Sequence, residues 1–288
     1  MNERTSERAY LDLQKLARHQ GRTTQQLFEL YIHERFLARL ATSRFVDQFV
    51  LKGGMLLAVL DVRRGTRDAD MLARGVARDD SNLRAVVSEI AAVPLADGVG
   101  FDTRAITITT IREGAEYEGV RVALPASLGG AALKLGIDLS FGDPVDPQGI
   151  DYPTLLDDQV FRLLGYPLES VIAEKADTMM FLGDANTRDR DYGDVYLLSE
   201  IHPVEAEPLR QTLRTVAEHR GHEVRPLEPL LETLRERRQQ PWEAFRVRAG
   251  LPGLPENFSD VVDVVVGLID GLQAVGISRW SPAKRKWE

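Results

Sequence analysis

The stretch from residue 49 to residue 72, FVLKGGMLLAVLDVRRGTRDADML, constrains the fold and the chemistry of this chain more than any other. It contains an apolar run, the glycine pair Gly53 and Gly54, a second apolar run, and then Asp68 and Asp70 with one residue between them. Glycine permits the positive φ of a tight strand-to-helix turn, and it lets backbone N–H groups approach a phosphate. Residues two apart on a strand share a face, so both carboxylates would point the same way. This order predicts a turn that faces a metal-bound triphosphate.

The spacing of the two aspartates predicts a divalent metal ion. Two carboxylates this close repel each other unless a cation neutralises them, and Mg²⁺ (or Mn²⁺) held by carboxylates and substrate phosphates is the expected solution. Asp138 lies in the segment 131–141, where apolar and polar residues alternate. This pattern predicts a neighbouring half-buried strand in which the Asp138 carboxylate points away from the protein core. We therefore predict Asp68, Asp70 and Asp138 as catalytic metal ligands, with Asp138 binding a second metal or activating the attacking hydroxyl. The alternatives are an acidic turn at 68–70 and an exposed strand aspartate at 138.

The residues around the glycine turn are the predicted contacts of the nucleotide. Gly53 and Gly54 would offer backbone N–H groups, while Lys52 and Arg67 would add positive charge near the phosphates. A simple strand-to-helix turn would also explain the two glycines, and a solvated flank would also explain Lys52.

Composition excludes several classes of protein. The chain has 44 acidic against 36 basic residues, a net charge of −8, which argues against a protein that coats nucleic acid but leaves room for a local basic surface. No apolar run reaches the length of a transmembrane helix, and the charged N-terminus does not resemble a secretory signal. The absence of cysteine excludes disulfides and thiolate zinc sites. These features predict a cytoplasmic protein with no membrane partner.

The pattern of apolar residues predicts two regions, 1–150 and 151–288. The first begins with helices over 4–45, broken at Gly21, and a capped helix after Asp79; it continues with a hairpin in which 120–124 is the second strand, and with the strand 131–141. The segment 142–153 is rich in turn residues and marks the boundary. The second region is predicted to be mainly helical, with helices at 168–182, 192–200, 203–219, 227–238 and 259–275.

Three segments resemble the core signature of the AbiEii nucleotidyltransferase family, the toxins of AbiE-type bacterial toxin–antitoxin systems, which include the MenT toxins. The family pattern is K-G-G-x-x-L followed by R-x-[ST]-x-D-x-D, and LKGGMLLAVLDVRRGTRDADML matches both parts. The family then carries a lysine on a helix, matched by Lys175 in SVIAEKADTMMFL, and a K/R-x-x-D-x-x-D segment, matched by RDRDYGDVYLL with Asp191 and Asp194. The resemblance covers about residues 25–200.

This resemblance implies an α+β fold: a polymerase-beta-like nucleotidyltransferase core of mixed sheet and helices, followed by a helical C-terminal region that completes the active site. It implies a metal-dependent enzyme that transfers nucleotides from an NTP to the 3′ end of tRNA, which blocks translation, and a cognate antitoxin as partner. Carried over residue by residue, Lys175 becomes a catalytic triphosphate contact and Asp194 an essential acidic residue. Thr66 stands where relatives have a hydroxyl beside the nucleotide.

Residue patterns alone leave other interpretations open. Lys175 could pack its stem against a helix and extend its ammonium to water, and Asp191 and Asp194 could be surface ion-pair partners of neighbouring arginines. At the level of function, the same site could modify a protein or a small molecule. A catalytically silent chain that binds a nucleotide or a partner is the remaining alternative.

Overall fold

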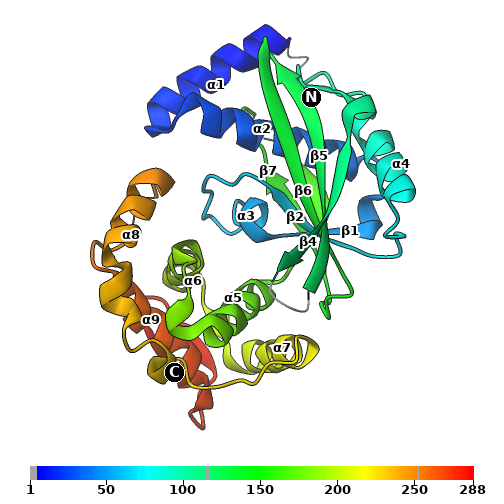
Figure 1. Cartoon of the computed structure of the whole chain (residues 1–288). Coiled ribbons are helices and arrows are strands. Elements are labelled where there is room, and N and C mark those ends of the chain that lie inside the picture. The colour runs from blue at the N-terminus through cyan, green and yellow to red at the C-terminus, as the bar shows by residue number, and fades with distance from the viewer. Residues whose placement is uncertain (1–4, 114–116, 158, 252) are drawn as a thin grey trace. The chain divides into compact units, whose positions relative to one another are not determined.

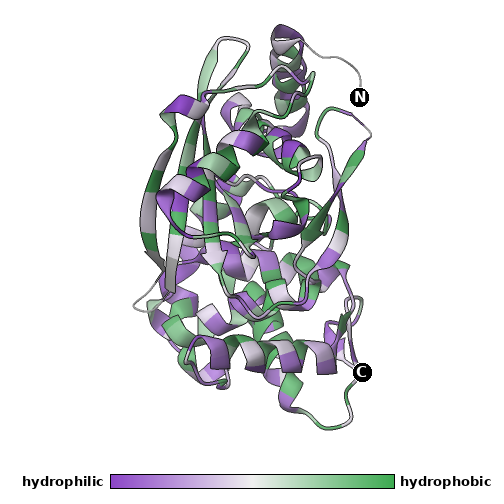
Figure 2. Ribbon diagram, turned by 90° about the vertical axis from the view of Figure 1, so that its right-hand side faces the viewer, coloured by the Kyte–Doolittle hydropathy of each residue, from purple (hydrophilic) through white to green (hydrophobic). Residues whose placement is uncertain are grey.

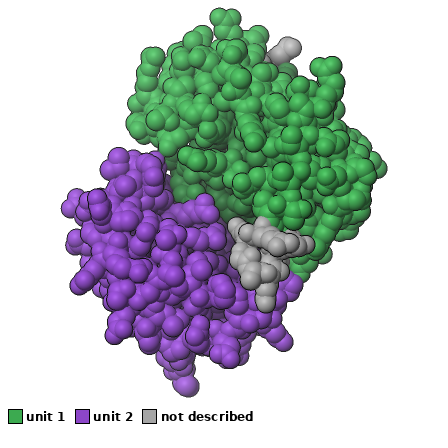
Figure 3. Space-filling model, in the orientation of Figure 1, with its two compact units in different colours: residues 1–59, 63–143, 147–166 green, residues 60–62, 144–146, 167–288 purple. Residues whose placement is uncertain are grey.

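The computed structural model describes residues 5–113, 117–157, 159–251 and 253–288. The chain forms two compact units, which Figure 3 colours separately. Unit 1 comprises residues 1–59, 63–143 and 147–166, and unit 2 comprises residues 60–62, 144–146 and 167–288. None of the helices in the described ranges is both long and apolar enough to cross a membrane.

Unit 1 is a mixed sheet with helices. Its strand order is β3-β5-β6-β2-β1-β8-β7, and β4 pairs with β5. β2 lies in the middle, antiparallel to β1 on one side and parallel to β6 on the other. The strands are β1 (Phe49–Lys52), β2 (Ala69–Ala73), β3 (Gly100–Phe101), β4 (Thr107–Glu113), β5 (Tyr117–Leu128), β6 (Ala131–Phe141), β7 (Gln148–Pro153) and β8 (Val160–Gly165), and the helices are α1 (Ser6–Gln20), α2 (Thr24–Ala41), α3 (Gly53–Leu56) and α4 (Asp80–Ala91) (Figure 1).

The local sequence explains where these elements begin and end. Gly21 ends α1 in the left-handed conformation, and Thr23 starts α2 with a capping box in which its hydroxyl accepts from the Gln26 N–H. Asp79 caps α4 in the same way as predicted. The alternation along β6 places every second residue from Leu133 to Phe141 in the core. Such interleaving of hydrophobic and hydrophilic residues along the strands is visible in Figure 2.

Unit 2 is mainly helical. α5 packs against α7, while α6 packs against α8 and α9. Trp242 and Trp280 are fully buried and fill the interior between these elements. The helices are α5 (Leu168–Leu182), α6 (Asp189–Ile201), α7 (Ala206–His219), α8 (Leu234–Ala249) and α9 (Phe258–Asp270), and a small sheet contains β9 (Val204–Glu205), β10 (Arg279–Ser281) and β11 (Lys286–Trp287).

The predicted α+β class, with a mixed sheet followed by helices, is confirmed, and 131–141 and 168–182 are β6 and α5. The five strands after β6 in the described ranges were not predicted: β7 lies in the turn-rich segment, and β8 to β11 follow it. β8 pairs in parallel with β1, so the compact units divide after Tyr166, beyond the predicted boundary at 150. The paired strands of the predicted hairpin are β4 and β5, and its turn lies outside the described residues.

Candidate functional site

Four charged residues form one row across the sheet of unit 1. Lys52 on β1 is the register partner of Asp70 on β2, Asp70 is the partner of Asp138 on β6, and Asp138 is the partner of Arg121 on β5. Directly paired residues on neighbouring strands project from the same face of a sheet. The structure therefore brings Asp70 and Asp138 side by side, with one basic residue on each flank. We call these four residues the charged row.

The glycine turn packs directly against the Asp70 carboxylate. Gly53 follows β1 with a φ of +61°, and a Cβ atom at this position would lie 2.0 Å from Oδ2 of Asp70. A Cβ at Gly54 would lie 2.7 Å from Oγ1 of Thr66. The positive φ predicted for this turn is confirmed at Gly53, and the lack of a side chain is what lets the carboxylate approach.

Asp68 lies in the same region, with its carboxylate against β6. It precedes β2 by one residue, and a Cβ atom at Gly136 on β6 would lie 2.2 Å from its Oδ1. The hydroxyl of Thr66 donates to the Asp68 carbonyl over 3.1 Å, which fixes the backbone just before the strand. Two glycines thus make room for the two aspartates, Gly53 for Asp70 and Gly136 for Asp68.

Arg121 is the residue of this region that sequence reasoning missed. Its Nε and Nη2 donate to the two oxygens of Asp138 over 2.7 and 2.6 Å, and Nη2 lies 3.4 Å from Oδ2 of Asp68. The hydrogen bond with Asp138 raises the pKa of Arg121 above its ordinary value, so the guanidinium stays charged. The available signal was its place on the predicted strand 120–124, between Val120 and Val122, but that signal needs the strand register.

Lys52 is held by a polar network inside unit 1. Its ammonium donates to Oδ2 of Asp143 over 2.9 Å, and Ser140 and Tyr166 donate to the same oxygen over 2.6 and 2.7 Å. The alternative of a solvated flank is therefore wrong for this lysine, since its side chain is mostly buried. Its role as a nucleotide contact stays a prediction.

The loop that leads into β2 is anchored to α2 by charge. Arg63 lies 3.4 Å from the buried carboxylate of Glu34, whose other oxygen accepts from Arg35 over 2.6 Å. Arg22 donates to the carbonyl of Arg63 over 2.5 Å. Burial raises the pKa of Glu34, and the positive charges of Arg35 and Arg63 oppose this effect. Arg67, the predicted nucleotide contact on this loop, is exposed.

The predicted residues of unit 2 form a second, buried cluster. Nζ of Lys175 on α5 donates to Oδ1 of Asp191 over 2.6 Å and to Oδ2 of Asp194 over 2.8 Å, both on α6. Arg188 also pairs with Asp191, at 2.8 Å. The Lys175 side chain is 13% exposed and that of Asp194 is 0% exposed, so the alternatives of a lysine extended to water and of surface aspartates are wrong.

This cluster makes the protein less stable at acid pH. Burial alone would raise the pKa of Asp191, but Lys175 and Arg188 outweigh burial and bring it to about 2. A carboxyl whose pKa falls on folding contributes stability that is present above its ordinary pKa of about 3.9 and is lost as the pH falls toward 2. We expect the thermal midpoint of the wild type to fall more steeply over this range than that of Asp191→Asn. Parallel acid slopes for the two proteins would contradict this prediction.

The carboxylates of unit 1 suit a hard divalent cation that arrives with its substrate. Among the described residues, no group of three or more His, Cys, Asp or Glu side chains is arranged to hold a metal ion by itself. Mg²⁺ in proteins is commonly held by one or two carboxylates together with substrate phosphates. Asp68 and Asp70, each beside a glycine that leaves space, fit that requirement. Asp138, the third predicted ligand, is fully engaged by Arg121.

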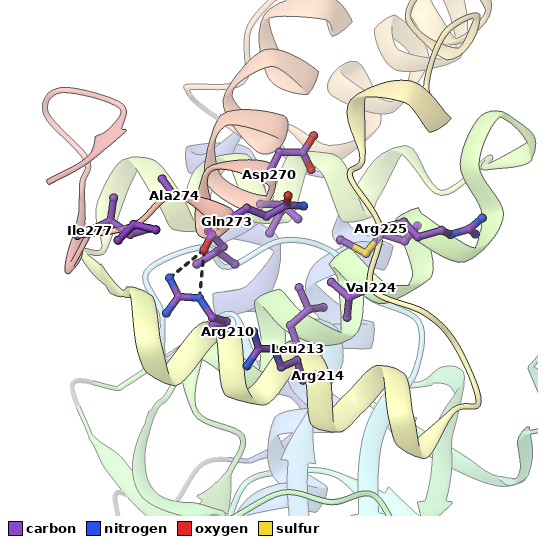
Figure 4. A pocket seen from close by; sticks show the side chains of 14 residues that line it. Arg210, Leu213, Arg214, Val224, Arg225, Asp270, Gln273, Ala274 and Ile277 are labelled. Atoms are coloured by element: carbon purple, nitrogen blue, oxygen red, sulfur yellow. Dashed lines mark hydrogen bonds between the residues drawn. The ribbon is translucent and has the colours of Figure 1, made fainter.

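Unit 2 also contains a cavity of about 520 Å³ that none of the predicted site residues lines. Leu213 and Val224 contribute apolar side chains to its lining, and Arg214 and Arg225 contribute charged ones (Figure 4). The guanidinium of Arg210 donates to the carbonyl of Leu272 across it, over 2.8 and 3.1 Å.

Gly53→Ala is expected to destabilise unit 1 and to displace Asp70. The left-handed conformation costs a non-glycine residue about 1–2 kcal/mol, and the added Cβ would also overlap the carboxylate. The matched control is Gly75→Ala, since Gly75 has a φ of +66° and no atom within 4 Å of a built Cβ. We expect urea unfolding to show a larger loss of free energy for Gly53→Ala than for Gly75→Ala. Equal losses would show that the contact with Asp70 is unimportant.

Comparison with known proteins identifies the family. The family described as nucleotidyl transferase AbiEii toxin, Type IV TA system, matches residues 35–264. Among solved structures, the chain is similar to MenT4, a nucleotidyltransferase toxin from Mycobacterium tuberculosis H37Rv, with a TM-score of 0.54, 18% identity and coverage of 91% of this chain and 99% of that chain. It is also similar to JHP933 from Helicobacter pylori, with a TM-score of 0.47, 15% identity and coverage of 85% and 93%.

Curated protein sequences give no match. The family match spans most of the chain, includes the glycine turn, the charged row and the buried cluster of unit 2, and agrees with the fold shared with MenT4. This chain therefore belongs to the AbiEii family of nucleotidyl transferase toxins, and its activity is that of a nucleotidyltransferase.

Proposed function

We propose that this protein transfers nucleotides from an NTP to the 3′ end of tRNA, with the help of Mg²⁺ or Mn²⁺, and thereby blocks translation. The observation that carries the proposal is the packing of the Asp70 carboxylate against Gly53, with Asp138 beside it on the next strand. This arrangement supports a site for a triphosphate and its metal ion. The toxin–antitoxin family further supports a cognate antitoxin as partner and a place of action in the cytoplasm, where tRNA and NTPs are found.

The residues of unit 1 would divide the work as follows. Backbone N–H groups of the Gly53–Gly54 turn would bind phosphate oxygens. The four residues of α3 are too few for a strong helix dipole. Asp68 and Asp70 would hold the metal ion, which when bound withdraws charge from the α-phosphate and from the pyrophosphate. Arg67 and Lys52 would add positive charge beside the phosphates.

The transfer itself is an in-line displacement. The acceptor 3′-oxygen forms a bond to the α-phosphorus while the bond to the bridging oxygen of the pyrophosphate breaks. The hydroxyl proton must leave, and Asp138 is the proposed acceptor. Since Arg121 donates to both oxygens of Asp138, that ion pair must open before Asp138 can take a proton.

In unit 2, Lys175 is the proposed triphosphate contact. Asp191 and Asp194 restrict its long side chain to one place, which lowers the entropic cost of binding an anion there. Asp194 would then act through Lys175, because its own carboxylate is fully buried.

Incubation of the pure protein with each α-³²P-labelled NTP, total tRNA and Mg²⁺ tests the proposal. We expect label on tRNA with at least one NTP, and none with Asp68→Ala or in the presence of a chelator. Absence of label on tRNA with all four NTPs would contradict the proposal. The net charge of −8 favours acceptors other than RNA as a second candidate, and label on an added protein or on an aminoglycoside in the same assay would identify it.

A further inference from the structure

The guanidinium of Arg121 occupies the place between two carboxylates where a cation is required. It takes both oxygens of Asp138, and its Nη2 lies 3.4 Å from Oδ2 of Asp68. Asp138 lies on β6 and Asp68 lies in the loop just before β2, so this one side chain joins the two sides of the proposed metal site. In this structure, Arg121 supplies the positive charge that the neighbouring carboxylates need.

A metal ion and Arg121 would compete for the same oxygens. A divalent cation that binds Asp138 would displace two short charge-assisted hydrogen bonds, which are the stronger class, and one that binds Oδ2 of Asp68 would displace the longer contact at 3.4 Å. The Arg121 side chain is 43% exposed and has a long flexible stem, so it is free to move without disturbing the core. The anionic triphosphate gives the displaced guanidinium a new partner.

We infer that Arg121 is a positioning residue that makes the divalent metal ion and the nucleotide bind together. Without nucleotide, Arg121 neutralises Asp138 and Asp68 and weakens metal binding. With nucleotide, its guanidinium moves onto the phosphates, and the carboxylates become available to the metal ion and to the acceptor hydroxyl. The inference rests on the proposed metal site, and it adds a residue that the family signature in this chain does not include.

A simpler interpretation is that Arg121 and Asp138 form an ordinary cross-strand ion pair that only stabilises the sheet. Partly exposed pairs of this kind contribute little to stability. Removal of the guanidinium leaves the carboxylates without their neutralising charge, so both interpretations allow tighter metal binding without nucleotide. They differ in the effect of the nucleotide: a purely structural pair predicts that the nucleotide improves metal affinity equally with and without Arg121, while the inference predicts a smaller improvement without it.

Measurement of Mn²⁺ binding to the full chain separates these interpretations. Binding is detected as a loss of the electron paramagnetic resonance signal of free Mn²⁺. The proteins are wild type, Arg121→Gln, Arg121→Lys and the control Arg104→Gln, whose arginine is 94% exposed beside Asp102. Each is titrated alone and with the α,β-methylene analogues of the four NTPs. Without nucleotide, we expect Arg121→Gln to bind Mn²⁺ about tenfold more tightly than wild type, because the competing hydrogen bonds are gone.

The nucleotide analogue should then improve Mn²⁺ affinity less in Arg121→Gln than in wild type. Arg121→Lys should lie between the two, since an ammonium cannot make the two-pronged contact, and Arg104→Gln should match wild type. Arg121→Lys carries the test if circular dichroism shows that Arg121→Gln does not fold. Mn²⁺ affinity of the folded variants equal to or below that of wild type would overturn the inference, and so would an equal improvement by the analogue in Arg121→Gln and wild type. If wild type binds no Mn²⁺ even with an analogue, the proposed metal site fails as well, which distinguishes the two failures.

Discussion

Asp70→Asn is expected to lower the rate of nucleotide transfer by about 10³-fold or more while the protein stays folded. The change keeps the shape of the side chain but removes the charge that is proposed to hold the metal ion beside the glycine turn. Metal ions contribute several kcal/mol to such reactions, and a loss of about 4 kcal/mol corresponds to about 10³-fold in rate. The measurement is the initial rate of label transfer under saturating NTP, together with the thermal midpoint of each protein.

The matched control is Asp151→Asn, which removes an exposed carboxylate from β7 in the same unit. We expect the control to retain the wild-type rate and both variants to retain the wild-type midpoint within a few degrees. An Asp70→Asn protein with more than a tenth of the wild-type rate would show that Asp70 does not hold the metal ion.

Lys175→Met is expected to destabilise the protein by about 3–5 kcal/mol, in addition to any effect on activity. Removing the ammonium leaves the buried carboxylates of Asp191 and Asp194 without their shared partner, although Arg188 still contacts Asp191. Breaking a buried ion pair from one side costs more than the pair contributes, because an uncompensated charge remains in the interior. Chemical unfolding at neutral pH measures the loss.

The control for this prediction is Lys286→Met, which removes an exposed lysine from β11 of the same unit. A second comparison, Lys175→Met combined with Asp194→Asn, should recover part of the lost stability because one of the buried charges is removed with it. If Lys175→Met unfolds at the same denaturant concentration as Lys286→Met, the cluster does not hold α5 and α6 together. Loss of activity in Lys175→Met is therefore interpretable only for protein shown to be folded.

The part of the site that was predictable from the sequence is the part that is local. Gly53, Asp68 and Asp70 lie within one short segment, and strand geometry alone puts the two carboxylates on one side. The strand that carries Asp138 was predicted because its residues alternate over its whole length. That it pairs with β2 in parallel, with Asp138 opposite Asp70, is a contact between distant segments.

The role of Arg121 and the burial of the Lys175 cluster could not be predicted from the sequence, because both depend on such contacts between distant segments. Arg121 meets Asp138 because β5 and β6 pair in one register, and a shift by one residue would have turned the arginine to the other face. Asp191 and Asp194 have the same spacing as surface ion-pair partners, and only the packing of α6 against α5, α8 and α9 shows that they are buried. The segment 142–153 is rich in turn residues, which predicted a domain boundary. β7 nevertheless forms there because it pairs with β8, a strand from later in the chain.

The central place of β2 in the sheet has a consequence for incomplete chains. β2 and its aspartates are made early, but their neighbour β6 ends only at Phe141. A truncated or still-growing polypeptide that stops before β6 has the D-x-D motif but lacks Asp138, the member of the charged row that pairs with both Asp70 and Arg121. Fragments of this toxin are therefore expected to be harmless to the cell that makes them.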